Sequence, residues 1–205
     1  MTALPLLPLP FLTRRLWLCA LLLTLALLTG CGVPAMAPQP APGWQGEAQT
    51  LKRKLTITPF DETRPEQTLL SVIRLSGEGL RVVIATPTGQ RLFTLVRDDQ
   101  GARYTQSIMD KPPFPAKWFA QRLEWSLRCE SALQEAFQGS AWQVQDQRFE
   151  HGRVREILDS NTLIARIDTI DRPADQIHDV LTDFQIGYRM VITPFGNDNS
   201  AGETP

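Results

Sequence analysis

The feature of this chain that most restricts its fold is a series of short strand-like segments, some with alternating polar and apolar residues and some, such as Leu80–Ala85, mostly apolar. Alternation with period two is typical of strands that bury one face. The first five segments, joined by tight turns, are Leu51–Thr58, Thr68–Leu75, Leu80–Ala85, Arg91–Val96 and Arg103–Ile108. The later five are Trp142–Phe149, Arg153–Leu158, Thr162–Ile170, Gln176–Phe184 and Gly187–Phe195. Such a series of about ten strands predicts one antiparallel sheet, which is too large to stay flat.

A single stretch of helical period, Ala116–Phe137, separates the two groups of strands. It follows Lys111-Pro112-Pro113-Phe114-Pro115, which neither a strand interior nor a helix interior accommodates. Its apolar residues form two neighbouring stripes, a wide arc that predicts a largely sheltered helix. The stripes are Phe119, Leu123, Leu127, Leu133 and Phe137, and Trp118, Trp125, Cys129, Ala132 and Ala136. We therefore expect an α+β fold, a single curved antiparallel sheet wrapped over one long helix.

Residues 1–30 have the layout of a secretory signal peptide, in which two arginines, Arg14 and Arg15, precede an apolar run. The run Leu16–Leu28 holds 13 residues, fewer than the roughly 20 that a membrane-spanning helix needs. It ends in Leu28-Thr29-Gly30-Cys31, which resembles the lipobox of bacterial lipoproteins. The resemblance implies cleavage after Gly30, a diacylglycerol on the Cys31 thiol and an N-acyl chain on the new amino terminus. The alternative is a transmembrane anchor with an incidental cysteine.

The residues after the cysteine predict where such a lipoprotein resides. Gly32 stands where an aspartate commonly retains lipoproteins in the inner membrane, which implies sorting to the outer membrane, facing the periplasm. Residues 31–50 hold the lipidated cysteine and a Pro-rich stretch, predicted as a flexible tether that reaches on the order of 60 Å at about 3.1 Å per residue. The folded domain is predicted over residues 51–195, and residues 196–205 as a disordered tail.

Charge and cysteine content limit which binding partners and which disulfide bonds can be expected. Removal of residues 1–30 leaves 19 basic and 22 acidic side chains, so the formal charge changes from −1 to −3. This balance gives no reason to expect nucleic acid as a partner. Cys129 is the only cysteine left once Cys19 is cleaved off and Cys31 is lipidated, so no intramolecular disulfide is expected. We expect one monomeric domain anchored to the membrane through lipid.

The sequence gives little support to catalysis or to a metal or other non-covalent cofactor. It has no Gly-x-Ser-x-Gly elbow, no His-Glu-x-x-His, no glycine-rich phosphate loop and no paired-cysteine metal site. His178-Asp179 suggests either part of a proton relay or, in an alternating strand, a solvent-facing pair, and the second is favoured. His151 is expected in a turn, and Cys129 as a small buried hydrophobe on the apolar side of the helix. We therefore predict that the protein is not an enzyme.

The aromatic helix is the best candidate for a ligand site. Its large side chains would line a pocket for an acyl or polyene chain, because such pockets are apolar with few polar groups. The candidate lining residues are Trp118, Phe119, Leu123, Trp125, Leu127 and Phe137. The competing interpretation is plain core packing. Arg122 and Glu130 would either orient a head group or reach out to water.

This order of elements resembles the LolA/LolB lipoprotein carriers, and most of all an uncharacterised family of Gram-negative outer-membrane lipoproteins related to LolB. Thr86-Pro87-Thr88-Gly89-Gln90-Arg91-Leu92-Phe93-Thr94-Leu95 resembles that family's strand-turn-strand signature, and Gly187-Tyr188-Arg189-Met190-Val191-Ile192 its closing strand. The resemblance implies an open half-barrel closed by helices over an apolar cavity. Two differences set the chain apart: the Pro-rich stretch replaces the helix before LolB's first strand, and neither early turn has room for LolB's protruding apolar loop.

Two function hypotheses from different classes follow. The first is an outer-membrane lipoprotein that binds or transfers a lipid-like molecule, with lipid or lipoprotein cargo and the lipoprotein-sorting machinery as partners. The second is a structural or assembly lipoprotein that acts through protein–protein contacts and has no ligand cavity. An esterase or thioesterase is a distant third.

Overall fold

The computed structural model of the chain describes residues 36–170 and 178–196. The predicted signal peptide, Cys31 and most of the predicted tail lie outside these residues. Within them, no helix has the length and apolar character that a membrane crossing requires.

Ten strands form one antiparallel sheet, as the alternating segments predict, with bounds that differ by a few residues. The strands are β1 (Gln49–Pro59), β2 (Gln67–Ser76), β3 (Gly79–Ala85), β4 (Arg91–Asp98), β5 (Gly101–Thr105), β6 (Trp142–Phe149), β7 (Gly152–Asp159), β8 (Thr162–Ile170), β9 (His178–Asp183) and β10 (Tyr188–Pro194). Strand β5 ends three residues before the predicted Ile108. Its successor Gln106 has a positive φ of 53°, which takes the chain out of extended geometry.

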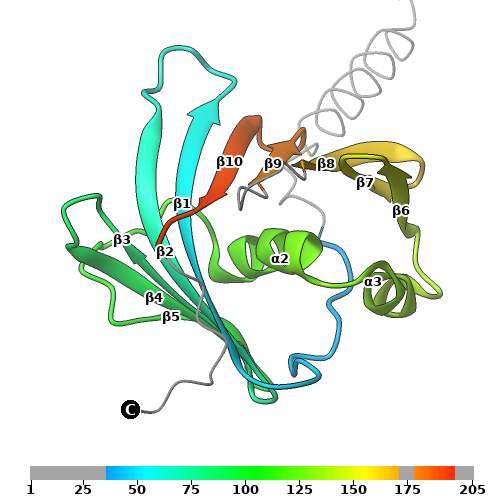
Figure 1. The fold of residues 1–205 in the computed structure, drawn as a ribbon, viewed down its shortest axis with the longest axis horizontal. Coiled ribbons are helices and arrows are strands. Elements are labelled where there is room, and N and C mark those ends of the chain that lie inside the picture. The colour runs from blue at the N-terminus through cyan, green and yellow to red at the C-terminus, as the bar shows by residue number, and fades with distance from the viewer. Residues whose placement is uncertain (1–35, 171–177, 197–205) are drawn as a thin grey trace, which may run out of the picture. The chain divides into compact units, whose positions relative to one another are not determined.

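The strand order is β5-β4-β3-β2-β1-β10-β9-β8-β7-β6, so the first and last strands pair at the centre of the sheet. Leu55 lies opposite Ile192 and Ile57 opposite Met190, which places the buried residues of β1 and β10 on one face. The sheet remains open, with β5 and β6 as its edges in the described part of the chain. It curves around a helix that lies in its hollow (Figure 1).

The predicted single helix is wrong in one respect, because it is divided into α2 (Ala116–Leu127) and α3 (Glu130–Phe137). Arg128 and Cys129 between them are extended, with ψ angles of 149° and 156°. The buried Arg155 of β7 donates hydrogen bonds to the carbonyls of Trp125 and Arg128, at 2.6 and 2.7 Å. A continuous helix would use these carbonyls for the N–H groups four residues further on. Arg155 thus replaces the lost helical bonds and stabilises the break.

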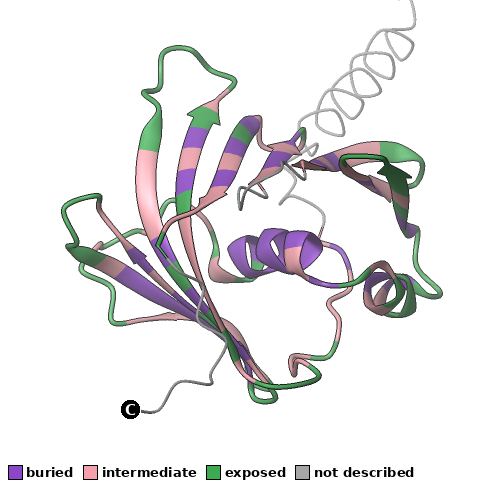
Figure 2. Ribbon diagram, in the orientation of Figure 1, coloured by how far each residue is buried: buried purple, intermediate pink, exposed green. Residues whose placement is uncertain are grey.

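The core lies between the inner face of the sheet and the two helices. Residues that share this face are buried on every strand except β5, whose residues are all half-buried (Figure 2). Their neighbours along the strand are more exposed on β1 and β2, whereas on β4 the five residues from Phe93 to Arg97 are all buried. The core includes Ile73, Val82, Leu95, Ile167 and Leu181. Where polar and apolar residues alternate, as in β1, the sequence therefore marks the correct inner face.

The flexible tether predicted for residues 31–50 is wrong for residues 36–44 and for residues 49–50, which begin β1. Residues 36–44, which we call the strap, pack on the helices, and Ala37 is only 2% exposed. Gln121 donates a hydrogen bond to the Ala37 carbonyl at 2.7 Å. Arg97 donates to the carbonyl of Pro40, and Arg128 to those of Ala41, Pro42 and Gly43. Proline-rich segments offer carbonyls without competing N–H groups, and these buried guanidinium groups require acceptors.

Candidate functional site

The residues predicted to line a ligand cavity lie in a densely packed aromatic layer between α2, α3 and the sheet. Trp118, Phe119, Leu123, Trp125 and Phe137 are each at most 4% exposed, and Leu127 is half-buried. Trp118 packs on Phe114 with ring centroids 4.7 Å apart and on Tyr188 at 5.6 Å. Trp125 and Phe137 pack on Trp142 at 6.0 and 6.2 Å. Three surface pockets in the described part of the chain are lined by none of the six side chains.

A fully buried arginine sits within this layer. The Arg122 guanidinium lies between the rings of Trp118 and Trp125, 4.4 and 4.2 Å from their centroids. Its Nε donates to Asp183 Oδ2 at 2.8 Å, and its terminal nitrogens donate to Gln121 and Gln185. Burial lowers the pKa of Arg122, and the Asp183 carboxylate opposes this change. Arg122 was expected either to orient a ligand head group or to extend into solvent, and the structure shows neither. Arg122 ties α2 to the turn between β9 and β10.

A groove separates the strap from α3. It has a volume of about 540 Å³. Pro40, Ala41 and Trp44 form one wall, and Ala132 and Ala136 belong to the other. Arg128 also contributes to its lining, and its guanidinium stacks 4.1 Å above the Trp44 ring. This volume lies in the range of small-molecule sites, roughly 300–1,000 Å³.

Cys129 is exposed, not buried as predicted, and it lines the same groove. The break in the helix explains the difference, because the predicted apolar stripe requires continuous helical geometry through residue 129. A hydrogen bond with Ser131 and the backbone N–H of Ala132 lower the pKa of the thiol. The thiol is therefore more acidic than an ordinary cysteine.

His178 and Asp179 do not form the solvent-facing pair that was predicted. Successive strand residues point to opposite faces, and Asp179 shares the inner face with Leu181, which pairs with the buried Met190. The Asp179 carboxylate accepts a hydrogen bond from Thr169 at 2.6 Å, and burial raises its pKa. His178 lies on the outer face. His151 is in the β6–β7 turn, as predicted, at a shallow outer pocket of about 490 Å³.

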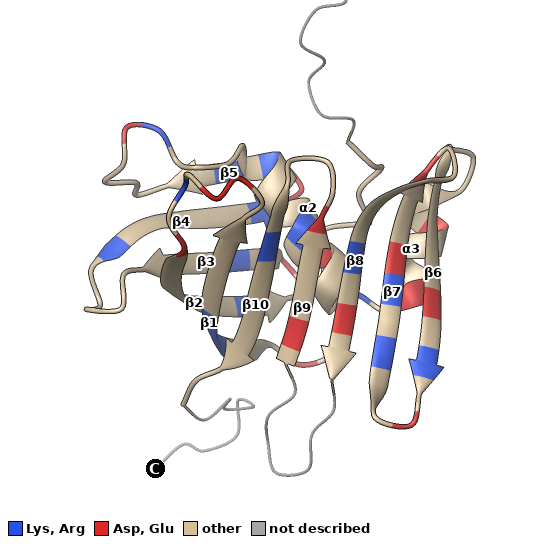
Figure 3. Ribbon diagram, turned by 90° about the horizontal axis from the view of Figure 1, so that it is seen from above, with Lys and Arg blue, Asp and Glu red and all other residues tan. Residues whose placement is uncertain are grey.

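Charged residues are frequent on β6–β9 (Figure 3), and the strand register places several of them on the inner face. Arg148 pairs with Arg153, Arg153 with Thr169, and Thr169 with Asp179, so these positions form a row across four strands. The adjacent row holds Asp146 opposite Arg155. Within the described ranges, no group of three or more His, Cys, Asp or Glu side chains is arranged to hold a metal ion.

Sequence reasoning missed these charged rows and the strap. A signal for the charged rows was present in the sequence. Arg153 and Arg155 lie four and two residues before Ile157, and Asp146 lies two residues after Val144, so a strand places all of them on the face of these apolar residues. The strap left no such signal, because its contacts use backbone carbonyls that every sequence has.

The open ten-stranded antiparallel sheet with helices in its hollow defines the fold class. The chain belongs to the family described as "Protein of unknown function (DUF3261)", whose sequence profile matches residues 50–196. A family of unknown function was predicted, while the lipid anchor stays a prediction. A search of curated proteins found no match. A LolA superfamily protein from Nitrosomonas europaea, a solved structure, is similar over 75% of this chain and 86% of its own, with 9% sequence identity and a TM-score of 0.36.

Proposed function

We propose that this protein binds or hands on a lipid-like, amphiphilic molecule, without converting it chemically, as an outer-membrane lipoprotein that faces the periplasm. The observation that carries the proposal is the groove of about 540 Å³ between the strap and α3. Its walls combine apolar surface from Trp44, Pro40 and the alanines of α3 with polar side chains that include Arg128 and Glu135. Such a distribution suits a molecule with an apolar body and a polar head.

The groove is a better candidate than the space beneath α2. Aromatic side chains fill that space, and a ligand there would have to displace Trp118, Trp125 and the Arg122–Asp183 ion pair. Separating buried charges costs several kcal/mol. The groove requires no such displacement, because it is already open at the surface.

The strap also determines how far the domain reaches from a lipid on Cys31. Four residues lie between Cys31 and Met36. The five peptide links from Cys31 to Met36 span at most about 18 Å, at ~3.6 Å per residue. With Cys31 lipidated, Met36 would lie within this span of the lipidated residue, much closer than the predicted 60 Å tether allows. This closeness favours exchange of an amphiphile with the membrane.

The proposal is tested by native mass spectrometry and lipid extraction of the protein purified from envelopes. Ala136→Trp places a large ring in the groove, and Gln134→Trp, an exposed position of α3 that does not line it, is the matched control. We expect an amphiphile to co-purify with the wild type and with Gln134→Trp, and to be lost from Ala136→Trp. Equal recovery from both variants would contradict the groove assignment.

The anchor is tested separately with Cys31→Ser. The variant is expected to leave the membrane fraction and appear in the soluble periplasmic fraction. Membrane fractionation at full yield would contradict lipidation.

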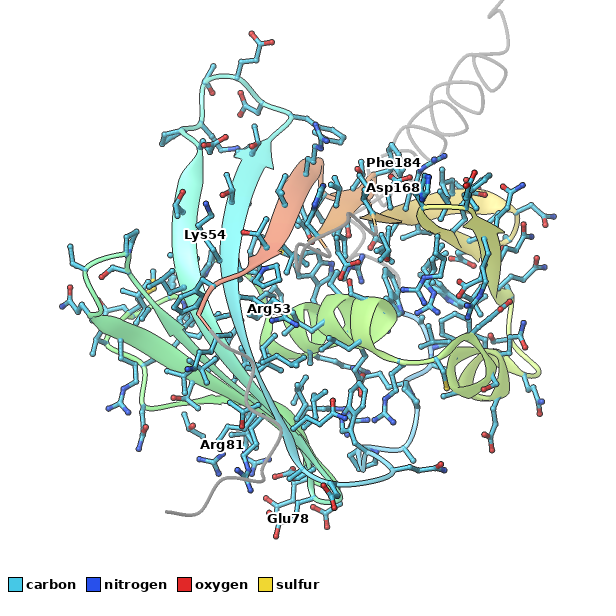
Figure 4. The ribbon with its side chains drawn as sticks, viewed as in Figure 1. Arg53, Lys54, Glu78, Arg81, Asp168 and Phe184 are labelled. Atoms are coloured by element: carbon cyan, nitrogen blue, oxygen red, sulfur yellow. The ribbon has the colours of Figure 1, made fainter. Side chains whose placement is uncertain are left out.

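A second candidate function, docking of a protein partner by a structural or assembly lipoprotein, is favoured by one exposed feature. Phe60 and Phe184 are 51% and 47% exposed, and their ring centroids lie 6.4 Å apart at the ends of neighbouring hairpins. Figure 4 labels Phe184. A photo-crosslinking residue at position 184 would form one defined protein adduct in cells if this function holds. The same residue at Val72, an exposed apolar position on β2, serves as control.

A further inference from the structure

The strand β6 forms an open edge of the sheet (Figure 3). In an antiparallel sheet, alternate residues of an edge strand direct their backbone N–H and C=O groups away from the neighbouring strand. From Gln143 to Phe149, these outward groups have no hydrogen-bond partner among the described residues. The residues on the outer face of this stretch are all exposed. A further strand can therefore add to the sheet at β6.

The edge β6 lacks most of the features that prevent such pairing. Proteins protect edge strands by keeping them short, or with lysine, proline or a bulge. The opposite edge, β5, has five residues, all half-buried. Strand β6 has eight residues, contains neither lysine nor proline, and pairs with β7 in one continuous register. Its protection consists of two charges on the inner face, Asp146 and Arg148, which oppose any pairing that leaves them beside a like charge or an apolar residue.

Only one register of β6 with itself pairs both of these charges. Two copies that join their sheets around a two-fold axis perpendicular to the sheet keep their inner faces on one side, so paired residues share a face. The axis then passes through a residue, which lies opposite itself. An axis at Asp146 or Arg148 places like charges opposite each other, and an axis at Val144 or Gln145 places Asp146 opposite an apolar residue. An axis at Gln147 places Asp146 of each copy opposite Arg148 of the other.

Both charges have the capacity for this pairing. Arg148 is exposed and makes no hydrogen bond or ion pair in the described part of the chain. Burial lowers the pKa of Arg153, and the positive charges of Arg155 and Arg148 lower it further, so Arg148 lies near like charges. Asp146 accepts two hydrogen bonds from Arg155, at 2.6 and 2.7 Å, and a carboxylate has about four acceptor sites.

The position of the strap favours a second copy over a free peptide as the occupant of this edge. Phe137 of α3 packs on Trp142 of β6, and the strap borders α3 across the groove. The same two-fold axis therefore places both straps on one side of the combined sheet. Two copies with the proposed lipid on Cys31 can then share one bilayer. Anchoring in one membrane raises the effective concentration of the short pairing stretch, Gln145–Phe149.

We propose that β6 pairs antiparallel with β6 of a second copy of this chain, around a two-fold axis at Gln147. The resulting dimer goes beyond the proposed function, uses no residue of the groove, and differs from the monomer expected from the sequence. Each copy supplies the backbone donors and acceptors that the edge of the other lacks. The contact is the same patch on both copies, so it occupies both β6 edges at once.

The test is disulfide cross-linking in envelopes of cells that produce the full chain with Cys129→Ser, which removes the exposed thiol. Gln147→Cys places a thiol at the axis, where directly opposite residues have Cα atoms about 4.5–5.5 Å apart, a distance that a disulfide bridges. Gln145→Cys is the matched control, because Gln145 is also exposed on the outer face of β6. Its two copies would lie about 13 Å apart, four residues at ~3.4 Å each, which is too far for a disulfide. Circular dichroism verifies the fold of each purified variant.

We expect a cross-linked dimer from Gln147→Cys, and no more from Gln145→Cys than from the parent Cys129→Ser. Arg148→Glu added to Gln147→Cys should lower the yield of dimer about tenfold, because it places like charges opposite each other twice. Arg81→Glu, at an exposed position on the outer face of β3, should leave the yield unchanged (Figure 4).

Three results would overturn the dimer: no cross-link from Gln147→Cys above the parent, equal cross-linking from the two cysteine positions, or a cross-link to a different protein. Equal effects of Arg148→Glu and Arg81→Glu would overturn the selection of the register by charge. None of these results bears on the groove, so the proposed function is tested separately.

Discussion

Removal of the Arg122 side chain is the sharpest test of what holds α2 in the hollow of the sheet. Arg122 and Asp183 are both 0% exposed, and their ion pair is 2.8 Å long. Arg122→Met preserves most of the volume and the apolar contact with the two tryptophans, but leaves the Asp183 carboxylate without its counter-charge. Removing one partner of a buried ion pair costs about 3–5 kcal/mol of unfolding free energy.

That loss is large because whole domains have unfolding free energies of about 5–15 kcal/mol. Two further terms act in the same direction. The oxygens of Gln121 and Gln185 lose their donor, and the two tryptophan rings lose a desolvated cation–π contact. The backbone N–H groups of Gln185 and Ile186 still donate to Asp183 Oδ1, which keeps part of the carboxylate satisfied. We therefore expect a loss within the stated range.

The assay is equilibrium urea unfolding followed by tryptophan fluorescence and, independently, by circular dichroism. Arg64→Met is the matched control, because the Arg64–Asp61 ion pair is 3.4 Å long but exposed. We expect no measurable change in the unfolding free energy of the control variant. If the midpoints of the two variants coincide at equal urea dependence, the stabilising role of the buried ion pair is refuted.

Three further outcomes are expected. Gly79→Ala should destabilise the fold more than Gly89→Ala, and thermal unfolding of both variants measures the difference. Both glycines have a positive φ, +136° and +86°, but the new methyl group at Gly79 would meet the Arg97 carbonyl, whereas the one at Gly89 would enter open space. Burial raises the pKa of Asp179, so the folded carboxyl holds its proton more tightly than the unfolded one, whose pKa is about 3.9. The protonated Asp179 carboxyl therefore contributes stability that is fully present below the unfolded pKa and is lost as pH rises through the folded pKa. Above about pH 4 the melting temperature of the wild type should fall relative to that of Asp179→Asn. Parallel curves of melting temperature against pH for the two proteins would contradict this. Maleimide should label Cys129 in the folded protein, as peptide mass spectrometry would show, and a need for urea would contradict its exposure.

Sequence by itself determined the strands and, where polar and apolar residues alternate, the face that is buried. Leu55 and Ile57 are buried as the alternation in their segment predicts, because a pleated strand turns successive side chains to opposite sides whatever the fold around it. The prolines before α2 likewise predicted its start, since proline forbids the interior of either element.

Only the tertiary structure decided the break between α2 and α3, the position of the strap and the partners of the inner charges. Arg155 lies 27 residues from Arg128, and Arg128 lies 85 from Gly43, so no local pattern links them. Local propensity acts over neighbouring residues, whereas a buried guanidinium takes whichever acceptors the folded chain places within reach. The pattern of a continuous apolar helix was therefore overridden by hydrogen bonds that exist only once β7 and the strap have packed against it.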